Sequence, residues 1–277
     1  MAGEILVTGG TGTVGSRTVA ALRSAGIAPR IAARTPHGDG QIRFDYGDAS
    51  TFQAALGGIG AVFLVAPSGV ADMLTAMRPF LEAAVSGRVE RFVLLSAAAL
   101  PEGGPLMGAV HAYLHERAPS YAALQPSWFM QNFTGGIPYP TIASENAVIS
   151  ATGDGRVAFV DAVDIAAVAA RALRDPELTG GLVITGPRPI SYDQAAEEIS
   201  RAAGRRITHR KLSPDQLATT LISRGMPEPY AHGLAAMDVE ISRGSEDRTT
   251  DVVERVMGCP PRSFESFAAD HASAWRA

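Results

Sequence analysis

The sequence predicts an α/β protein with a doubly wound parallel sheet, followed by a smaller and mainly helical C-terminal lobe. In the first half of the 277-residue chain, short apolar segments alternate with segments of helical periodicity. Successive βαβ units produce this order. Beyond residue 126 the alternation loosens, which indicates a change of organisation. A hydrophobic content of 46% supplies enough apolar side chains for a core.

The first strand, turn and helix are the clearest elements. Residues 4–7 form an apolar strand, and a glycine-rich turn follows it. In the next segment Val14, Val19 and Leu22 lie on one helical face, and a glycine at 26 is suited to end the helix. The second strand is predicted at 30–33.

Later elements follow the same patterns. Ser191 and Ser213 each open a capping box, Ser-x-x-Gln, and each box predicts a helix that runs to a glycine. Ser50 is expected to cap a short helix, and a last helix is expected from Ser263 to the end of the chain. Further strands are predicted at 42–45, 61–66, 91–96, 121–124 and 182–185, and further helices at 50–56, 72–85, 107–118 and 165–173.

The glycine-rich turn carries the first chemical signal. Glycines at 9, 12 and 15 allow a tight turn, close approach of the backbone to phosphate oxygens, and close packing of helix on strand. Backbone N–H groups at the helix start then face an anion. We therefore expect a Rossmann-type site for a dinucleotide; an ordinary glycine-rich turn is the alternative. The turn residues expected at the cofactor are Gly9, Thr11, Gly12, Thr13, Val14 and Gly15.

The end of the second strand indicates which dinucleotide binds. A site for NAD usually has an acidic residue here, about 20 residues past the glycines, to hold the ribose 2′-hydroxyl. This chain has Arg34, and a guanidinium can pair with a 2′-phosphate. The predicted cofactor is therefore NADPH/NADP. A solvated surface arginine is the alternative.

Ligands of doubly wound sheets bind at the carboxyl ends of the strands. The predicted strand ends add Asp45, Ala66, Pro67 and Ser96 to the candidate cofactor site, and they point to residues 125–130.

Charge and cysteine content exclude several classes of function. A net charge of −4 argues against nucleic acid or an anionic membrane as the main partner. Cys259 is the single cysteine, so no internal disulfide is possible. Because the first residues are predicted to form a core strand, we expect no signal peptide. No apolar run is long enough to span a bilayer. We expect a cytoplasmic monomer or homodimer with a small-molecule substrate. The basic residues of 205–211 are expected on the solvent face of a strand.

Several segments together resemble one known family. Residues 127–133 read Ser-Trp-Phe-Met-Gln-Asn-Phe, and a late Gly-Cys-Pro-Pro-Arg begins at 258. With the segments 8–15, 94–97, 159–166 and 184–187, the chain resembles the NmrA-like group of atypical short-chain dehydrogenases. Within that group it is similar to the branch that contains iminium reductases of ergot-alkaloid pathways and bacterial relatives. The family usually has arginine where this chain has Gln125.

The resemblance implies NADPH with its nicotinamide near Ser96, Pro126 and Phe129. It also implies a nucleotide-binding domain at 1–135, with returning segments around 158–188, and a substrate-binding lobe at 136–157 and 189–277. Members of the family reduce iminium, quinone, enone or ketone groups, and some have lost catalysis and act as NADP sensors.

The usual proton donor of short-chain dehydrogenases is missing. Their Tyr-x-x-x-Lys motif cannot occur, because Lys211 is the single lysine and residue 207 is isoleucine. Tyr113 and Arg117 have the spacing of the Tyr-x-x-x-Lys pair on one helix, so Tyr113 is a candidate proton donor. An accidental match to the motif is the favoured interpretation. His111 and His115 can also donate; surface or packing histidines are the favoured interpretation. Ser96 can orient a substrate carbonyl; the alternative is a strand-end serine whose hydroxyl forms a hydrogen bond with the backbone.

Aromatic and methionine side chains gather in two late segments, which suits a large, flat, conjugated substrate. Plain core packing is the alternative and is expected for some of them. The candidate substrate residues are Trp128, Phe133, Tyr139, Met226 and Tyr230.

Two functions from different classes remain open. The first is an NADPH-dependent reductase of a bulky aromatic or polycyclic ketone, quinone or iminium compound in specialised metabolism. Hydride transfer to such groups does not require a strong acid, so proximity and orientation can supply much of the catalysis. The second is a non-catalytic NADP-sensing regulator.

Overall fold

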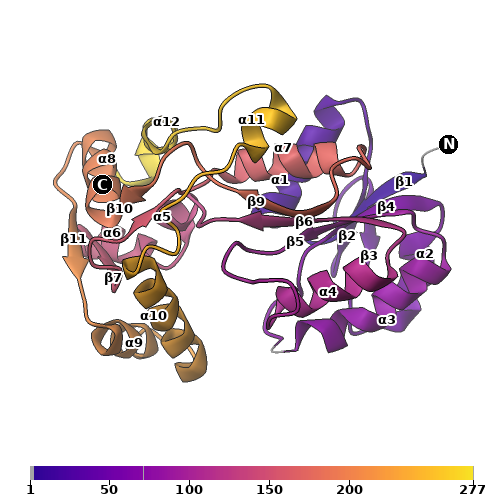
Figure 1. Cartoon of the computed structure of the whole chain (residues 1–277), viewed down its shortest axis with the longest axis horizontal. Coiled ribbons are helices and arrows are strands. Elements are labelled where there is room, and N and C mark those ends of the chain that lie inside the picture. Colours follow the sequence, from indigo (N-terminus) through magenta and orange to yellow (C-terminus); the bar gives the residue numbers. More distant parts are fainter. Residues whose placement is uncertain (1–2, 71, 277) are drawn as a thin grey trace. The chain divides into compact units, whose positions relative to one another are not determined.

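The computed structural model describes residues 3–70 and 72–276. The chain forms two compact units, whose elements are labelled in Figure 1. The first unit contains residues 1–126, 162–184 and 252–259, and the second contains 127–161, 185–251 and 260–277. Each unit is described by itself below.

The first unit is built on a seven-stranded sheet with the order β3-β2-β1-β4-β5-β6-β9. Every neighbouring pair is parallel, so the carboxyl ends of all strands lie at one edge. The order reverses at β1, and β4 lies on its other side, which is the doubly wound arrangement. The strands are β1 (Glu4–Val7), β2 (Arg30–Ala33), β3 (Gln41–Arg43), β4 (Ile59–Leu64), β5 (Arg91–Leu95), β6 (Ser120–Pro126) and β9 (Gly180–Ile184).

Helices cover both faces of this sheet. In Figure 1, α1 and α7 lie on one face, while α2, α3 and α4 lie on the other. α1 and α7 pack against each other, as do α3 and α4. The helices are α1 (Thr13–Ser24), α2 (Phe52–Leu56) after a 3₁₀ turn η1 (Ala49–Thr51), α3 (Met73–Ser86), α4 (Met107–Arg117), α7 (Ala162–Ala172) and α11 (Val252–Met257).

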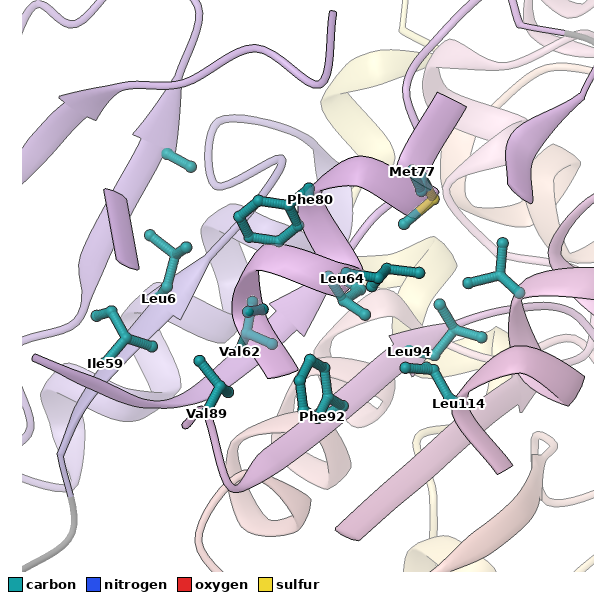
Figure 2. Close-up of a cluster of buried hydrophobic side chains, with 14 of the residues drawn as sticks. Leu6, Ile59, Val62, Leu64, Met77, Phe80, Val89, Phe92, Leu94 and Leu114 are labelled. Atoms are coloured by element: carbon teal, nitrogen blue, oxygen red, sulfur yellow. The ribbon is translucent and has the colours of Figure 1, made fainter. Parts of the chain in front are cut away.

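An apolar cluster joins the sheet to the helix layer that contains α3 and α4. Figure 2 shows β-strand side chains such as Leu6, Val62 and Phe92 facing Phe80 and Met77 of α3. All five are fully buried. Burial of apolar surface contributes roughly 25 cal/mol per Å², so this cluster is a main source of the unit's stability.

The second unit combines two small sheets with helices. β7 pairs in parallel with β11, and β8 pairs antiparallel with β10. Its core centres on Phe133, Phe159 and Phe264, whose rings meet edge to face or tilted. The elements are α5 (Asn132–Gly135), α6 (Tyr139–Glu145), β7 (Ala147–Ser150), β8 (Arg156–Val157), β10 (Ile190–Ser191), α8 (Tyr192–Ala203), β11 (Thr208–Lys211), α9 (Pro214–Ser223), α10 (Glu228–Ser242), α12 (Phe264–Asp270) and a 3₁₀ turn η2 (Ala272–Ala274).

Capping residues fix several helix starts. The capping boxes at Ser191 and Ser213 are both formed, and Ser263 caps α12, as predicted. Two local predictions were wrong. Asp48 rather than Ser50 accepts the capping bond, because its carboxylate reaches the backbone N–H of Ser50. The last helix ends at Asp270 instead of continuing.

The basic segment 205–211 also differs from its prediction. Arg210 and Lys211 are exposed, as expected, and pair with carboxylates. His209 instead has a fully buried side chain, and its Nε2 atom lies 2.8 Å from the Ser150 hydroxyl oxygen. Alternation along β11 turns this residue inward, because successive side chains of a strand point to opposite faces.

No helix in the described part of the chain is both long and apolar enough to cross a bilayer.

Candidate cofactor site and family

The turn between β1 and α1 is shaped by its glycines. Gly9 has a φ of +59°, and a Cβ atom added there would lie 2.9 Å from the Cβ atom of Val65. A Cβ atom on Gly15 would overlap the carbonyl oxygen of Gly9. The backbone N–H of Gly12 donates to that same oxygen at 2.9 Å. Residues with a Cβ atom therefore do not fit at Gly9 or Gly15.

The start of α1 is suited to an anion. Gly12 is the N-cap and supplies no side-chain hydrogen bond, and the first turn contains no acidic residue. Thr11, Gly12 and Thr13 are exposed. The N–H groups of the first turn carry the positive end of the helix dipole, so phosphate oxygens can accept from them. The glycine turn and this helix start together fit a dinucleotide pyrophosphate.

Arg34 lies directly after β2, which is the neighbour of β1. Its side chain is exposed, and it forms no ion pair or hydrogen bond with residues 3–70 or 72–276. The turn lies close to β2, since a Cβ atom on Gly10 would come within 2.5 Å of the Ile31 Cγ2 atom. The guanidinium therefore remains available to a phosphate near the glycine turn.

Three other predicted cofactor residues follow strands of the same edge. Asp45 comes after β3, and its Oδ1 atom accepts from the Gly47 N–H at 2.9 Å. Ala66 and Pro67 come shortly after β4 and are half-buried. The sheet order therefore places all three at the carboxyl edge with the glycine turn.

Ser96 directly follows β5 and is 8% exposed. Its backbone N–H donates to the Leu124 carbonyl at 2.8 Å, but its buried hydroxyl has no hydrogen-bond partner in the part of the chain that the structure describes. A buried hydroxyl without a partner is costly. A ligand with a polar group near the ends of β5 and β6 would satisfy it. Pro126, the last residue of β6, belongs to the same edge.

The candidate proton donors lie on α4. The Arg78 guanidinium of α3 lies 5.3 Å from the ring centre of Tyr113. Burial raises the pKa of Tyr113, with a further increase from Glu82, which makes its hydroxyl a weaker acid. His111 is buried, and desolvation lowers its pKa. His115 is exposed and lies 2.5 Å from a Glu102 carboxylate oxygen. The histidines thus fit their packing and surface interpretations.

The candidate substrate residues belong to the second unit, and burial separates them. Phe133 is fully buried in the aromatic core, which is the core packing that the sequence left open. Trp128, Tyr139 and Met226 are half-buried, and Tyr230 is 60% exposed. Phe129, which was expected near the nicotinamide, belongs to the same unit and is also half-buried. Tyr139 also donates to the Ala274 carbonyl at 3.3 Å.

One buried acidic residue of the second unit was not singled out from the sequence. Glu246 is 4% exposed and accepts a 2.8 Å hydrogen bond from the Ser127 hydroxyl. Burial raises the pKa of this carboxyl. The two residues are 119 positions apart, and no local pattern marks either one.

Comparisons with known proteins agree with this geometry. The sequence pattern that defines the NmrA-like family matches residues 109–263. The uncharacterized oxidoreductase YesF of Bacillus subtilis is 43% identical over 98% of this chain and 96% of its own length. Agroclavine dehydrogenase of Claviceps fusiformis is 37% identical over 98% of each chain. The chain belongs to the NmrA-like family.

A solved structure has the same fold as this NmrA-like protein. The NADPH-dependent quinone oxidoreductase QOR2 of Escherichia coli, in complex with NADPH, aligns with a TM-score of 0.82 at 25% identity. The alignment covers 96% of this chain and 99% of that one. The Rossmann-type fold, the oxidoreductase class and a nicotinamide dinucleotide as cofactor are thereby confirmed as predicted.

Proposed function

We propose that this NmrA-like protein is an NADPH-dependent reductase of a bulky aromatic or polycyclic ketone, quinone or iminium compound in specialised metabolism. The observation that carries the proposal is the carboxyl edge of the sheet. There the glycine-rich turn and the unpaired, exposed Arg34 offer binding groups for a pyrophosphate and a 2′-phosphate.

The preference for the phosphorylated cofactor rests on charge. A carboxylate in place of Arg34 would repel the 2′-phosphate, whereas a guanidinium can bind it through two hydrogen bonds. No carboxylate of the described residues competes for Arg34, so its charge remains uncompensated until a ligand binds.

The proposed reaction does not require a strongly acidic side chain in the protein. When bound, NADPH supplies a hydride. An iminium carbon is already cationic, and a quinone or conjugated ketone spreads the developing negative charge, so water can supply the proton. The side chains would then bind and orient the reactants, which is a large part of catalysis. Ser96 is proposed to donate its free hydroxyl to a polar group of the bound pair.

The substrate class is proposed from two observations. The half-buried Trp128, Tyr139 and Met226 and the exposed Tyr230 offer aromatic and thioether surface for a flat ligand. The similar proteins are named for agroclavine and for quinones. Both features favour a conjugated, ring-containing substrate.

The decisive experiment follows NADPH oxidation by absorbance against three probes: 1,4-naphthoquinone, a polycyclic aromatic ketone and an N-methyl-3,4-dihydroisoquinolinium salt. We expect turnover with at least one probe and preference for NADPH over NADH. Tight NADPH binding without turnover of any probe would favour the second function.

The second candidate is an NADP-sensing regulator without catalysis. It is favoured by the environment of Tyr113, because burial raises its pKa and the chain's single lysine is engaged with carboxylates elsewhere. A regulator of this kind would bind NADPH and NADP with measurably different affinity and would reduce none of the three probes.

A further inference from the structure

A tyrosine hydroxyl bonds the residue that precedes the glycine turn and has no role in the site described above. Tyr46 follows β3, and its ring packs edge to face on Phe44 and Phe80, with centroids 4.8 and 5.6 Å away. Its hydroxyl oxygen lies 3.2 Å from the Val65 carbonyl oxygen and 3.3 Å from the Thr8 hydroxyl oxygen. One side chain therefore reaches the ends of both β1 and β4.

Thr8 is the centre of this network. Its hydroxyl donates to the Phe63 carbonyl at 2.9 Å and accepts from the Val65 N–H at 2.8 Å. The Tyr46 O–H is shared between Thr8 and Val65 as acceptors. Thr8 is fully buried, so each of these bonds is protected from water. The network joins the segments that follow β1, β3 and β4.

The two residues that Tyr46 reaches also border Gly9. Thr8 precedes Gly9 in the chain, and the Val65 side chain occupies the place that a Cβ atom on Gly9 would need. A shift of Thr8 or Val65 would therefore move the first residue of the turn. Burial raises the pKa of Tyr46 far above its usual value, so the hydroxyl remains a donor throughout the working pH range.

We propose that Tyr46 is a positioning residue for the dinucleotide: through Thr8 and Val65 it holds the glycine turn in the shape that the pyrophosphate and adenosine side of the cofactor require. The inference rests on the proposed function, since it assumes that the turn binds NADPH. It predicts that removal of one hydroxyl, with the ring retained, weakens cofactor binding without affecting the chemical step.

The test uses the full chain and the variants Tyr46→Phe, Thr8→Val and Thr8→Ser. Dissociation constants for NADPH and for 2′,5′-ADP are measured by fluorescence and calorimetry. Loss of one hydrogen bond predicts an increase of about tenfold in both constants for Tyr46→Phe. Thr8→Val should behave similarly or worse, whereas Thr8→Ser, which keeps the hydroxyl, should remain within about twofold of wild type.

Two further readouts separate positioning from general stability. At saturating NADPH the kcat of Tyr46→Phe should equal that of wild type, while its KM for NADPH rises. Tyr121→Phe is the matched control, because among the described residues Tyr121 takes part in hydrogen bonds only through its backbone. Its NADPH affinity should not change. Thermal melting of the unliganded proteins records any loss of stability.

Distinct outcomes overturn the two proposals. If wild type does not bind NADPH, the proposed function fails and takes this inference with it. If wild type binds NADPH but Tyr46→Phe and Thr8→Val bind it equally well, only the positioning role fails, whatever their melting temperatures. A lower kcat with unchanged affinity would also overturn that role.

Discussion

The ammonium group of Lys211 lies 2.6 Å from a carboxylate oxygen of Asp154. A second carboxylate, that of Asp193, lies 3.1 Å from the same nitrogen. The hydrogen bonds to Asp154 and Asp193 raise the pKa of Lys211. The chain's single lysine is thus committed to a surface ion-pair network, and Tyr113 lacks the lysine that would lower its pKa in an ordinary short-chain dehydrogenase.

This commitment predicts weak effects for the candidate proton donors. Tyr113→Phe, His111→Ala and His115→Ala should each lower kcat less than about tenfold. Loss of a residue that acts as the general acid usually costs about a hundredfold or more in rate, so a small effect shows that none of the three is the acid. The measurement is steady-state NADPH oxidation with a probe that is turned over. A loss beyond about a thousandfold for any one variant would assign it the role of the acid.

Arg34 should control the choice between NADPH and NADH. Arg34→Ala removes a charge-assisted interaction with the 2′-phosphate, so the affinity for NADPH should fall about ten- to a hundredfold. The affinity for NADH should stay the same. Fluorescence titration checks both. Arg23→Ala is the control, because Arg23 is an exposed arginine in the last turn of α1; this variant should bind both cofactors as wild type does. If Arg34→Ala loses affinity for NADPH and NADH equally, the assignment of Arg34 to the 2′-phosphate is contradicted.

Ser96→Ala should separate stability from activity. The variant removes a buried hydroxyl that has no partner among the described residues, so the unliganded protein should gain about 1 kcal/mol of unfolding free energy. Activity should nevertheless fall about tenfold if that hydroxyl binds the reacting pair. Chemical denaturation and kcat/KM are the measurements.

Ser150→Ala provides the contrast for that variant. The Ser150 hydroxyl is also buried but lies 2.7 Å from the Thr152 hydroxyl and 2.8 Å from His209, so its loss should destabilise the protein. If Ser96→Ala is destabilised to the same extent, Ser96 has a structural role instead.

Asp238 should make stability depend on pH. Burial raises its pKa from 3.8 to about 6, although a hydrogen bond from the Ala151 N–H lowers it again in part. The folded state therefore holds this proton more tightly than the unfolded state. The associated stability is fully present below about pH 4 and is lost as the pH rises through about 6. The difference between the two pKa values corresponds to about 3 kcal/mol.

Asp238→Asn tests this dependence directly. The variant should match wild type near pH 4 and become progressively more stable than wild type toward pH 7.5, as measured by chemical denaturation at each pH. Asp39→Asn, which changes an exposed carboxyl, should follow wild type throughout. A constant difference between Asp238→Asn and wild type at all pH values would show that ionisation of Asp238 is not responsible.

Several elements of both units were predictable because their signals are local. Strand β2 and the N-cap residues Ser191 and Ser213 were located from the sequence, since apolar runs and capping boxes depend on residues only a few positions apart. Small helices and strands of the second unit, such as α6, β8 and β10, were not predicted. They are short, and their apolar residues face a core assembled from distant segments.

The sequence by itself determined the glycine turn, the arginine after the second strand and the absence of a Tyr-x-x-x-Lys motif, because each depends on residue identity and short spacing. Only the tertiary structure decided that Phe133 belongs to a core, that His209 points inward and that Tyr46 reaches Thr8, 38 positions earlier. The physical reason is that burial and long-range hydrogen bonds arise from packing between segments that no local pattern relates.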